Sequence, residues 1–316
     1  MALPECLSGR LRLPVVAAPM FLVSGPELVM AACRAGVLGT FPALNQRTSE
    51  GFEAWLTEIR ETLEPLGNDA APFGVNLIVH RSNPRLEADL ALCVRHRVPV
   101  IITSLGAVAD LVETVHGYGG VVFHDVVNIR HARKAAEAGV DGLIAVSAGA
   151  GGHAGSMSPF ALVSEIRQFF DKTVLLAGSI SEGRHVAAAR ALGADLAYLG
   201  TRFIATRESR ASDDYKQMIV ASAAGDIVYT DAVSGVPANF LGASLQTNGY
   251  DLADLASRGL GHGQLKPIGD EVKAWKTIWS AGQGVGGIRD IPAAGELVAR
   301  IDEEYRAALA ALADES

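Results

Sequence analysis

One histidine stands among glycines in residues 146–155, which read Val-Ser-Ala-Gly-Ala-Gly-Gly-His-Ala-Gly. A stretch with so few side chains cannot be held by its own packing, and glycine lets a backbone come close to a flat or charged group. The ionisable side chain here is that of His153, whose ordinary pKa of about 6.5 suits a general base that takes a proton from carbon. A structural histidine that caps the next helix or packs under the loop is the alternative. Because glycines flank it, we predict that His153 is catalytic and that Gly151 and Gly152 contact the ligand.

Eight short apolar runs along the chain predict buried strands, and the histidine stretch follows the sixth of them. The runs are 13–20, 37–41, 73–79, 99–103, 120–124, 142–146, 173–177 and 195–199. Helical patterns lie between them, at 26–35, 49–64, 84–96, 107–117, 128–138, 160–170 and 182–191. Eight alternations favour an α/β protein built as a (β/α)8 TIM barrel over an open doubly wound sheet, which usually has about five or six strands.

The pattern changes after Arg207 to polar, glycine-interrupted and mostly helical sequence. Strong helical periodicity returns only at 292–312, and an apolar helical stretch at 275–288 ends in a glycine-rich turn. We therefore predict a barrel domain over residues 1–207. Residues 208–316 are predicted to form a helical cap that covers the substrate and does not fold independently.

The active site of such a barrel lies at the C-terminal ends of its strands, so the residues found there predict the site lining. Gly178-Ser179 follow the seventh strand and Gly200-Thr201 the eighth, where loops commonly bind phosphate. Ordinary turns have the same composition, but their occurrence after both strands favours a phosphate site. The other strand ends hold Ala18, Pro19, Met20, Asn76, Thr103, Ser104, His124 and Asp125.

Three of these strand-end residues have two interpretations each. Asn76 lies within an apolar run and needs a buried partner, which is either the edge of a ligand ring or a hydroxyl of a neighbouring strand. Met20 either contacts a cofactor or fills the core. His124 is either a polar ligand contact or a hydrogen-bonded core residue.

Composition excludes several classes of protein. Among 316 residues, 49% are hydrophobic and 20% charged, and the net charge of −8 argues against binding to nucleic acid or to an anionic membrane. Cys6, Cys33 and Cys93 are far apart without CxxC spacing, which indicates neither a metal site nor a disulfide framework. No signal peptide and no long apolar run is apparent. We expect a soluble cytoplasmic protein.

Together these motifs resemble the FMN-dependent nitronate monooxygenases, formerly called 2-nitropropane dioxygenases. The resemblance extends over residues 10–290. Its motifs are Ala18-Pro19-Met20, Gly74-Val75-Asn76, Ala150-Gly-Gly-His153-Ala-Gly155, Ala177-Gly-Ser-Ile180, Leu199-Gly-Thr-Arg-Phe203 and Ser280-Ala-Gly-Gln283-Gly284. FMN-dependent enoyl-acyl-carrier-protein reductases and NADH:quinone reductases share most of them.

The resemblance implies FMN as cofactor and a role for each matching residue. His153 would be the base or the substrate-positioning group near the flavin N5, and Met20 and Gln283 would line the flavin. The strand-end loops at Gly178-Ser179 and Gly200-Thr201 would hold the phosphate. Asn76 would meet the edge of the ring, and the loop residues Ala18, Pro19, Gly151 and Gly152 would contact the cofactor.

The chain departs from the family pattern at two positions. Gly149 stands where the family commonly has Glu. Asp125 stands where related flavin barrels often have Lys, which leaves His124 as the polar cofactor contact there. An aspartate would not stabilise an anionic reduced flavin as a lysine does.

The resemblance further implies a monooxygenase that oxidises nitronates or nitroalkanes with O₂ to a carbonyl compound and nitrite. Its partners would be the small nitronate substrate and O₂, and a homodimer is left open. Two alternatives stay open. One is an NAD(P)H-dependent FMN reductase of enoyl thioesters or quinones, and the other is a flavin-free barrel that binds a phosphorylated metabolite.

Overall fold

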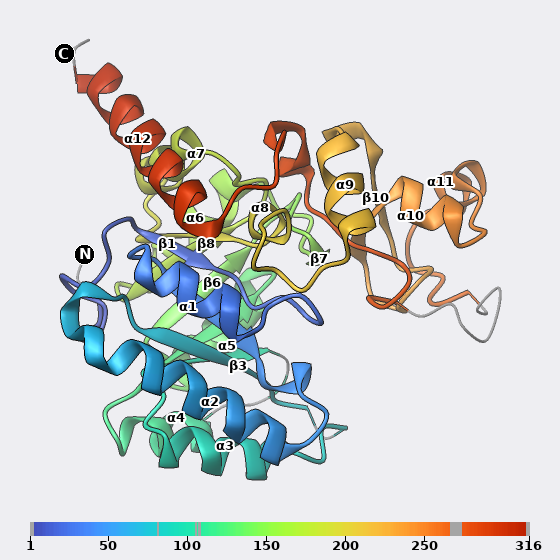
Figure 1. Ribbon diagram of the computed structural model, residues 1–316. Helices are drawn as coiled ribbons and strands as arrows, with labels where there is room; N and C mark the ends of the chain where they lie inside the picture. Colours follow the sequence, from blue (N-terminus) through green and yellow to red (C-terminus); the bar gives the residue numbers. More distant parts are fainter. Residues whose placement is uncertain (1–2, 81, 105, 107–108, 266–273, 314–316) are drawn as a thin grey trace.

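Eight parallel strands close into a barrel in this computed structural model, which describes residues 3–80, 82–104, 106, 109–265 and 274–313 (Figure 1). Around the barrel the order is β1-β2-β3-β4-β5-β6-β8-β9. The strands are β1 Val15–Ala17, β2 Leu38–Pro42, β3 Phe73–Ile78, β4 Val100–Ser104, β5 Val121–Val126, β6 Gly142–Val146, β8 Thr173–Ala177 and β9 Leu196–Leu199. β1 pairs with both β2 and β9, and Val15 lies opposite Ala197. The predicted (β/α)8 TIM barrel is confirmed.

In the described part of the chain, seven helices connect consecutive barrel strands. They are α1 Pro26–Arg34, α2 Ser49–Leu63, α3 Leu86–Arg95, α4 Ala109–His116, α5 Ile129–Glu137, α6 Pro159–Ile166 and α7 Gly183–Ala191. Local signals start several of them: Thr48 and Asn128 cap α2 and α5 with side-chain oxygens, and α1 and α6 begin with proline. Each agrees with a predicted helix, although the predicted start of α4 at residues 107 and 108 lies outside the described residues.

Alternate residues of each strand face opposite sides of the barrel wall. Residues such as Val16, Ile102 and Phe123 form an apolar cluster inside the barrel. Their strand neighbours, such as Ile101 and Val122, pack against the helices in a larger cluster. This alternation decides which strand-end side chains reach the interior, because a shift of one residue reverses the face.

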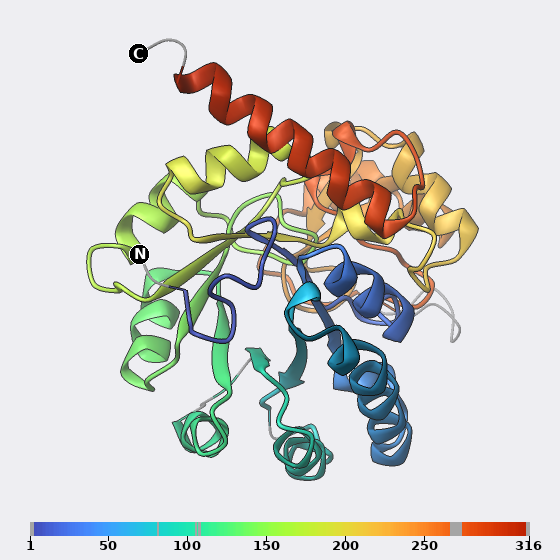
Figure 2. The ribbon, with the colours of Figure 1, turned by 60° about the vertical axis from the view of Figure 1, so that its left-hand side comes forward.

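The eighth helix of the ring comes from the end of the chain. α12 Ala294–Ala313 packs against α7 and α1, and Figures 1 and 2 both show it alongside α7. Close approach to α7 occurs at Gly183, whose N–H donates to Glu304 Oε2 at 2.7 Å. The chain thus leaves the barrel after β9, through the short helix α8 Thr201–Ile204, and returns with α12.

Between α8 and α12 lies the cap, with helices and a small sheet. Its helices are α9 Asp213–Ala221, α10 Gly242–Thr247 and α11 Leu252–Arg258. Strands β10 Ile227–Thr230 and β11 Ala238–Leu241 form an antiparallel sheet with β7 Gly152–His153. The sequence did not predict this sheet, because strands of two to four residues show too little alternation to be recognised.

One predicted helix of the cap is wrong. In the stretch 275–288, a turn closed by a bridge between Ala274 and Ile278 precedes a 3₁₀ helix, Gln283–Gly287. Glycines at 282, 284, 286 and 287 explain the absence of an α-helix there, since each costs about 1 kcal/mol relative to alanine. The boundary at residue 207 stays a prediction. Within the described ranges, no helix has the length and apolarity that crossing a membrane requires.

Candidate active site

Four glycine-rich segments meet at the C-terminal ends of β6, β8 and β9. We call them the glycine cradle: residues 149–151, 178–179, 200–201 and 281–284. The last segment joins the others, since Gln283 N–H donates to Gly149 O and Gly282 N–H donates to Thr201 Oγ1, both at 2.9 Å. Ser181 Oγ donates to Gly284 O at 2.9 Å. The cap thereby holds the three strand-end loops together.

Gly149 occupies a position where no side chain fits. Its φ is +81°, a left-handed conformation that favours glycine. A Cβ there would clash with Ser179 Oγ and lie 2.9 Å from Gln283 Oε1. Close approach also joins Gly151 to Gly282, because a Cβ on Gly151 would lie 2.9 Å from Gly282 N. The cradle is therefore a surface of backbone.

Backbone donors are available in the cradle. The N–H groups of Gly178, Ser179, Gly200 and Thr201 donate to no acceptor within the described part of the chain. Ser179 has a φ of +55°, which is uncommon for a residue with a side chain. The N-terminus of α7 does not contribute, since its Gly183 N–H donates to Glu304. These free N–H groups and the nearby hydroxyls form a site that suits an anion such as phosphate.

At the same end of the barrel, polar side chains face inward from the three adjacent strands β3, β4 and β5. We call Asn76, Ser104 and Asp125 the polar relay. Asn76 Nδ2 donates to Ser104 Oγ at 2.9 Å, and Ser104 Oγ donates to Asp125 Oδ2 at 2.5 Å. The other oxygen, Asp125 Oδ1, is buried without a hydrogen-bond partner. Burial raises the pKa of Asp125 to about 6, although the bond from Ser104 acts in the opposite direction.

His153 lies on β7, which places it between the barrel and the cap. Its backbone pairs with Ala238 of β11, and its ring meets Trp275 edge to face with centroids 5.2 Å apart. Trp275 in turn stacks on Phe240 at 5.1 Å. The residue remains exposed on its other side. Partial desolvation lowers the pKa of His153 below its ordinary value, so the imidazole is neutral near pH 7.

Two cap side chains hold the loop on either side of His153. Asn239 Nδ2 donates to Ala150 O at 2.7 Å, and Tyr229 OH donates to Ala154 O at 2.9 Å. Sequence reasoning missed Asn239, Tyr229 and Trp275 as parts of the site. The sequence feature that could have indicated them is the set of aromatic and polar residues in the short segments of the cap. Only the folded structure places these segments beside residue 153.

Most of the predicted site residues come together. Gly151, Gly178, Ser179, Gly200, Thr201 and Gln283 belong to the cradle, and Gly152 precedes His153 on β7. Ala18 and Met20 lie beside Gly200: Met20 Sδ would be 3.8 Å from a Cβ there and Ala18 Cβ 3.9 Å. Pro19 lies between them in the chain. Asn76 faces the barrel interior in the polar relay, where it meets a hydroxyl of a neighbouring strand.

His124 is not brought to this group. It shares the outward face of β5 with Val122 and Val126, and its Nδ1 lies 2.7 Å from Thr103 Oγ1. Burial, and less strongly the nearby His131, lowers the pKa of His124 to about 4. The structure thus gives it the surroundings of a hydrogen-bonded core residue. The inward residue of this strand end is Asp125, which strict alternation along β5 indicates.

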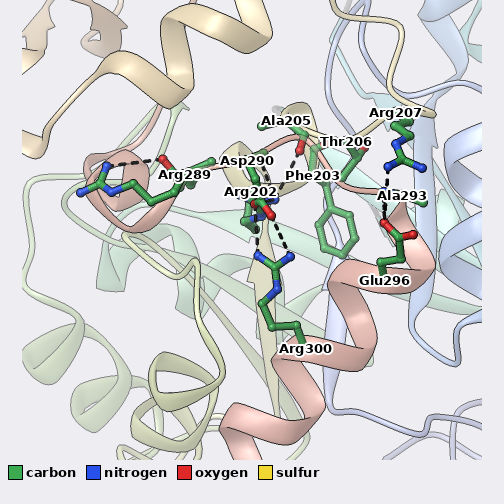
Figure 3. A network of polar contacts seen from close by, with 11 residues as sticks. Arg202, Phe203, Ala205, Thr206, Arg207, Arg289, Asp290, Ala293, Glu296 and Arg300 are labelled. Atoms are coloured by element: carbon green, nitrogen blue, oxygen red, sulfur yellow. Dashed lines mark hydrogen bonds and ion pairs between the residues drawn. The ribbon is translucent and has the colours of Figure 1, made fainter.

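An ion-pair network of Arg202, Asp290 and Arg300 connects the segment after β9 to α12 (Figure 3). The guanidinium of Arg202 is buried, and its Nη2 donates to Asp290 Oδ1 at 3.2 Å and to Ala205 O at 3.4 Å. Arg300 of α12 also donates to Asp290, at 2.7 Å. The loop that carries Thr201 is thereby tied to the eighth helix of the ring.

Comparison with known proteins identifies relatives of this chain. A family model described as nitronate monooxygenase matches residues 83–304. A (3aS,4S,5R,7aS)-5-hydroxy-7a-methyl-1-oxo-octahydro-1H-indene-4-carboxyl-CoA dehydrogenase of Rhodococcus jostii is 31% identical over 232 residues, which cover 73% of this chain but only 63% of that protein. A nitronate monooxygenase of Paraburkholderia phytofirmans is 27% identical over 346 residues, covering 93% of this chain and 92% of the relative.

Two solved structures have the same overall fold. Nitroalkane oxidase from Streptomyces ansochromogenes superposes with a TM-score of 0.80 and 27% identity, over 98% of this chain and all of that one. FabK from Thermotoga maritima also superposes with a TM-score of 0.80, at 26% identity, over 99% of this chain and 98% of that one. Barrel and cap are therefore common to proteins with different names.

Proposed function

We propose that this protein, which belongs to the nitronate monooxygenase family, binds FMN and oxidises nitronates or nitroalkanes with O₂ to a carbonyl compound and nitrite. The family makes the protein an oxidoreductase. The observation that carries the proposal is the position of His153, a neutral imidazole presented on β7 next to the glycine cradle. A small-molecule substrate and a cytoplasmic location are part of the proposal.

The residues of the cradle fit FMN. A phosphate suits the free N–H groups of Gly178, Ser179, Gly200 and Thr201, because they can donate to its oxygens. The lack of a Cβ at Gly149 lets Ser179 and Gln283 pack directly against its backbone, which brings the loops of the cradle together. Ala18 and Met20 add an apolar wall next to Gly200. We assign the cofactor phosphate to the strand-end loops of β8 and β9.

Bound FMN would supply the electron transfer between the substrate and O₂. The part played by the protein is to position the substrate and to handle one proton. His153, neutral near pH 7, accepts the proton from the carbon next to a nitro group, or hydrogen-bonds an oxygen of a nitronate that has already lost it. Trp275 limits the orientations of the imidazole and excludes water from one side of it.

His153→Asn tests the catalytic assignment. The variant keeps a polar side chain but loses the base, so we expect flavin binding unchanged and turnover of a neutral nitroalkane lowered by about a hundredfold or more. A preformed nitronate needs no proton removal and should be affected less. If the variant turned over each of the two substrates as fast as the wild type does, the role of His153 would be refuted.

The cofactor and the reaction are tested together by anaerobic flavin reduction. The purified protein should absorb near 450 nm, and a nitronate should bleach that absorption while NADH and NADPH do not. Rapid bleaching by a nicotinamide nucleotide alone would replace the proposal with the reductase alternative. A colourless protein that cannot be reconstituted with FMN would favour the flavin-free barrel.

A second candidate function is oxidoreduction of a coenzyme A thioester. The observation that favours it is the Rhodococcus jostii relative, which is a carboxyl-CoA dehydrogenase by name and is 31% identical over its aligned 232 residues, against 27% over 346 residues for the nitronate monooxygenase. The same anaerobic assay discriminates, with an acyl-CoA and an enoyl-CoA as further substrates. Bleaching or reoxidation by a thioester, without activity on nitronates, would establish this candidate.

A further inference from the structure

Asp125 is a buried carboxyl that faces the interior of the barrel near the C-terminal ends of the strands. Inward-facing residues near the C-terminal ends of seven strands are Thr40, Asn76, Ser104, Asp125, Val146, Ala177 and Tyr198. Only Asp125 and Tyr198 in this set can ionise, and neither can carry a positive charge. A carboxyl in this place therefore has no cation beside it among the described inward residues.

The contacts of Asp125 do not neutralise it. Its Oδ2 accepts from the neutral hydroxyl of Ser104, and its Oδ1 has no partner. On the side of β6 the inward residues are the apolar Ile144 and Val146. Across the interior, the charge of Asp125 adds to burial in raising the pKa of Tyr198 well above its ordinary range, so the phenol stays neutral.

The order of strands places this carboxyl at the barrel mouth, on the strand next to β6 and two strands from β8. β4 is four strands from β9 in either direction around the ring, so Ser104 lies across from the loop of β9, and β5 with Asp125 lies between β4 and the strand β6 that carries the first cradle segment. A long ligand with its phosphate at the loops of β8 and β9 and its other end over the barrel mouth would lie above the inward-facing Asp125. The ring of FMN is the part of that ligand farthest from the phosphate.

We propose that Asp125 sets the electron affinity of the bound flavin, by opposing negative charge on the reduced ring. This inference rests on the FMN site of the proposed function. Two-electron reduction of bound FMN by a reductant such as a nitronate would leave the ring anionic if it took up one proton and neutral if it took up two. An uncompensated carboxylate nearby disfavours the anion, so reduction becomes coupled to uptake of the second proton.

The carboxylate has this effect only when it is ionised. Burial raises the pKa of Asp125 to about 6, so the group is charged at pH 8 and neutral at pH 5. The groups that face it, Ser104, Asn76 and Tyr198, keep their charge state across this range. Asp125 is thus a positioning residue that acts through its field, with a signature that depends on pH.

The test is the reduction potential of the flavin in the holoenzyme, measured against a reference dye without oxygen at pH 5 and pH 8. At pH 8 and a fixed solution potential, we expect Asp125→Asn to hold about tenfold more reduced flavin than the wild type. At pH 5 the two proteins should agree within about twofold. Asp171→Asn, which removes an exposed carboxyl before β8, should match the wild type at both pH values.

Equal potentials of the wild type and Asp125→Asn at pH 8, or a shift of the same size at pH 5, would overturn the inference. If Asp125→Asn does not retain FMN, Asp125→Ser removes the same charge and has the same expected result. The failures are separable. A wild type that binds no FMN refutes the proposed function, whereas a wild type that oxidises nitronates with a potential insensitive to Asp125 refutes this inference alone.

Discussion

His124 and Asp125 are consecutive residues of β5 whose side chains lie on opposite sides of the barrel wall. Asp125 faces the interior and accepts from Ser104, whereas His124 packs among the helices and pairs with Thr103. Burial moves their pKa values in opposite directions, to about 6 for the acid and about 4 for the base. Both groups are therefore more readily neutral in the folded protein than in the unfolded chain.

The first prediction concerns stability in acid. Because the pKa of His124 falls from 6.5 to about 4 on folding, stability is lost as pH decreases through this window. His124→Asn removes this loss. The difference in unfolding free energy between the variant and the wild type should therefore increase in favour of the variant as pH falls, by up to about 3 kcal/mol. Urea unfolding without added flavin, between pH 4 and 7.5, measures the difference.

Asp125→Asn provides the opposite pH dependence as a control. The raised pKa of Asp125 means that the wild type loses stability as pH rises from about 4 through about 6. The stability of Asp125→Asn relative to the wild type should therefore increase as pH rises. Differences that do not vary with pH would contradict the assignment of both burial effects.

The second prediction concerns the cradle. Gly149→Ala combines a left-handed φ with a clash against Ser179, whereas Gly119→Ala has a similar φ of +86° and open space around its Cβ. Both should lose about 1 kcal/mol of stability from backbone strain. Only Gly149→Ala should also lower FMN affinity, by about tenfold or more, as measured by flavin fluorescence. Equal FMN affinities in the two variants would remove Gly149 from the cofactor site.

The third prediction concerns the imidazole of His153. Trp275→Ala hydrates the ring and should raise the pKa of His153 toward 6.5, which moves the acid limb of nitroalkane oxidation to higher pH. NMR titration of the histidine C–H signals measures the shift, with His153→Asn identifying the signal. Trp279, stacked on Tyr215, provides the matched control, and Trp279→Ala should leave this pKa unchanged. An unmoved signal in Trp275→Ala would show that the indole does not desolvate His153.

The fourth prediction concerns the network behind the cradle. Asp290→Ala leaves the buried guanidinium of Arg202 without its carboxylate and should cost about 2–3 kcal/mol of stability. Arg300→Ala removes a partner whose side chain is half exposed and should cost less than about 1 kcal/mol. Chemical denaturation distinguishes the two. Equal losses would mean that burial of Arg202 does not determine the energy of the network.

The barrel could be read from the chain because each buried strand is an apolar run of its own and each helix carries local start signals. It was harder to predict which side of the barrel wall an individual side chain faces. His124 and Asp125 are both polar and adjacent, and only the alternation of β5, fixed by neighbours such as Phe123, decides which faces the interior.

The surroundings of His153 could not be predicted from nearby residues. Its contacts are Ala238 and Trp275, which lie more than eighty residues away in the chain. Ala238 is on a strand too short to recognise, and Trp275 is in the turn between Ala274 and Ile278. The cradle was easier to predict because glycines after consecutive strands of a closed barrel must converge. The contribution of Gly282 and Gln283 followed only from the resemblance, since nothing in their local sequence places them against Gly149.

The late position of α12 has a consequence for synthesis of the protein. Residues 294–313 pack against α1 and α7, so a nascent chain on the ribosome exposes the apolar seam between those two helices until α12 has emerged. Chaperones that bind exposed apolar surface would meet this seam first. Closure of the helix ring around the barrel is thus completed after translation of the cap, whose strand β11 pairs with the loop that carries His153.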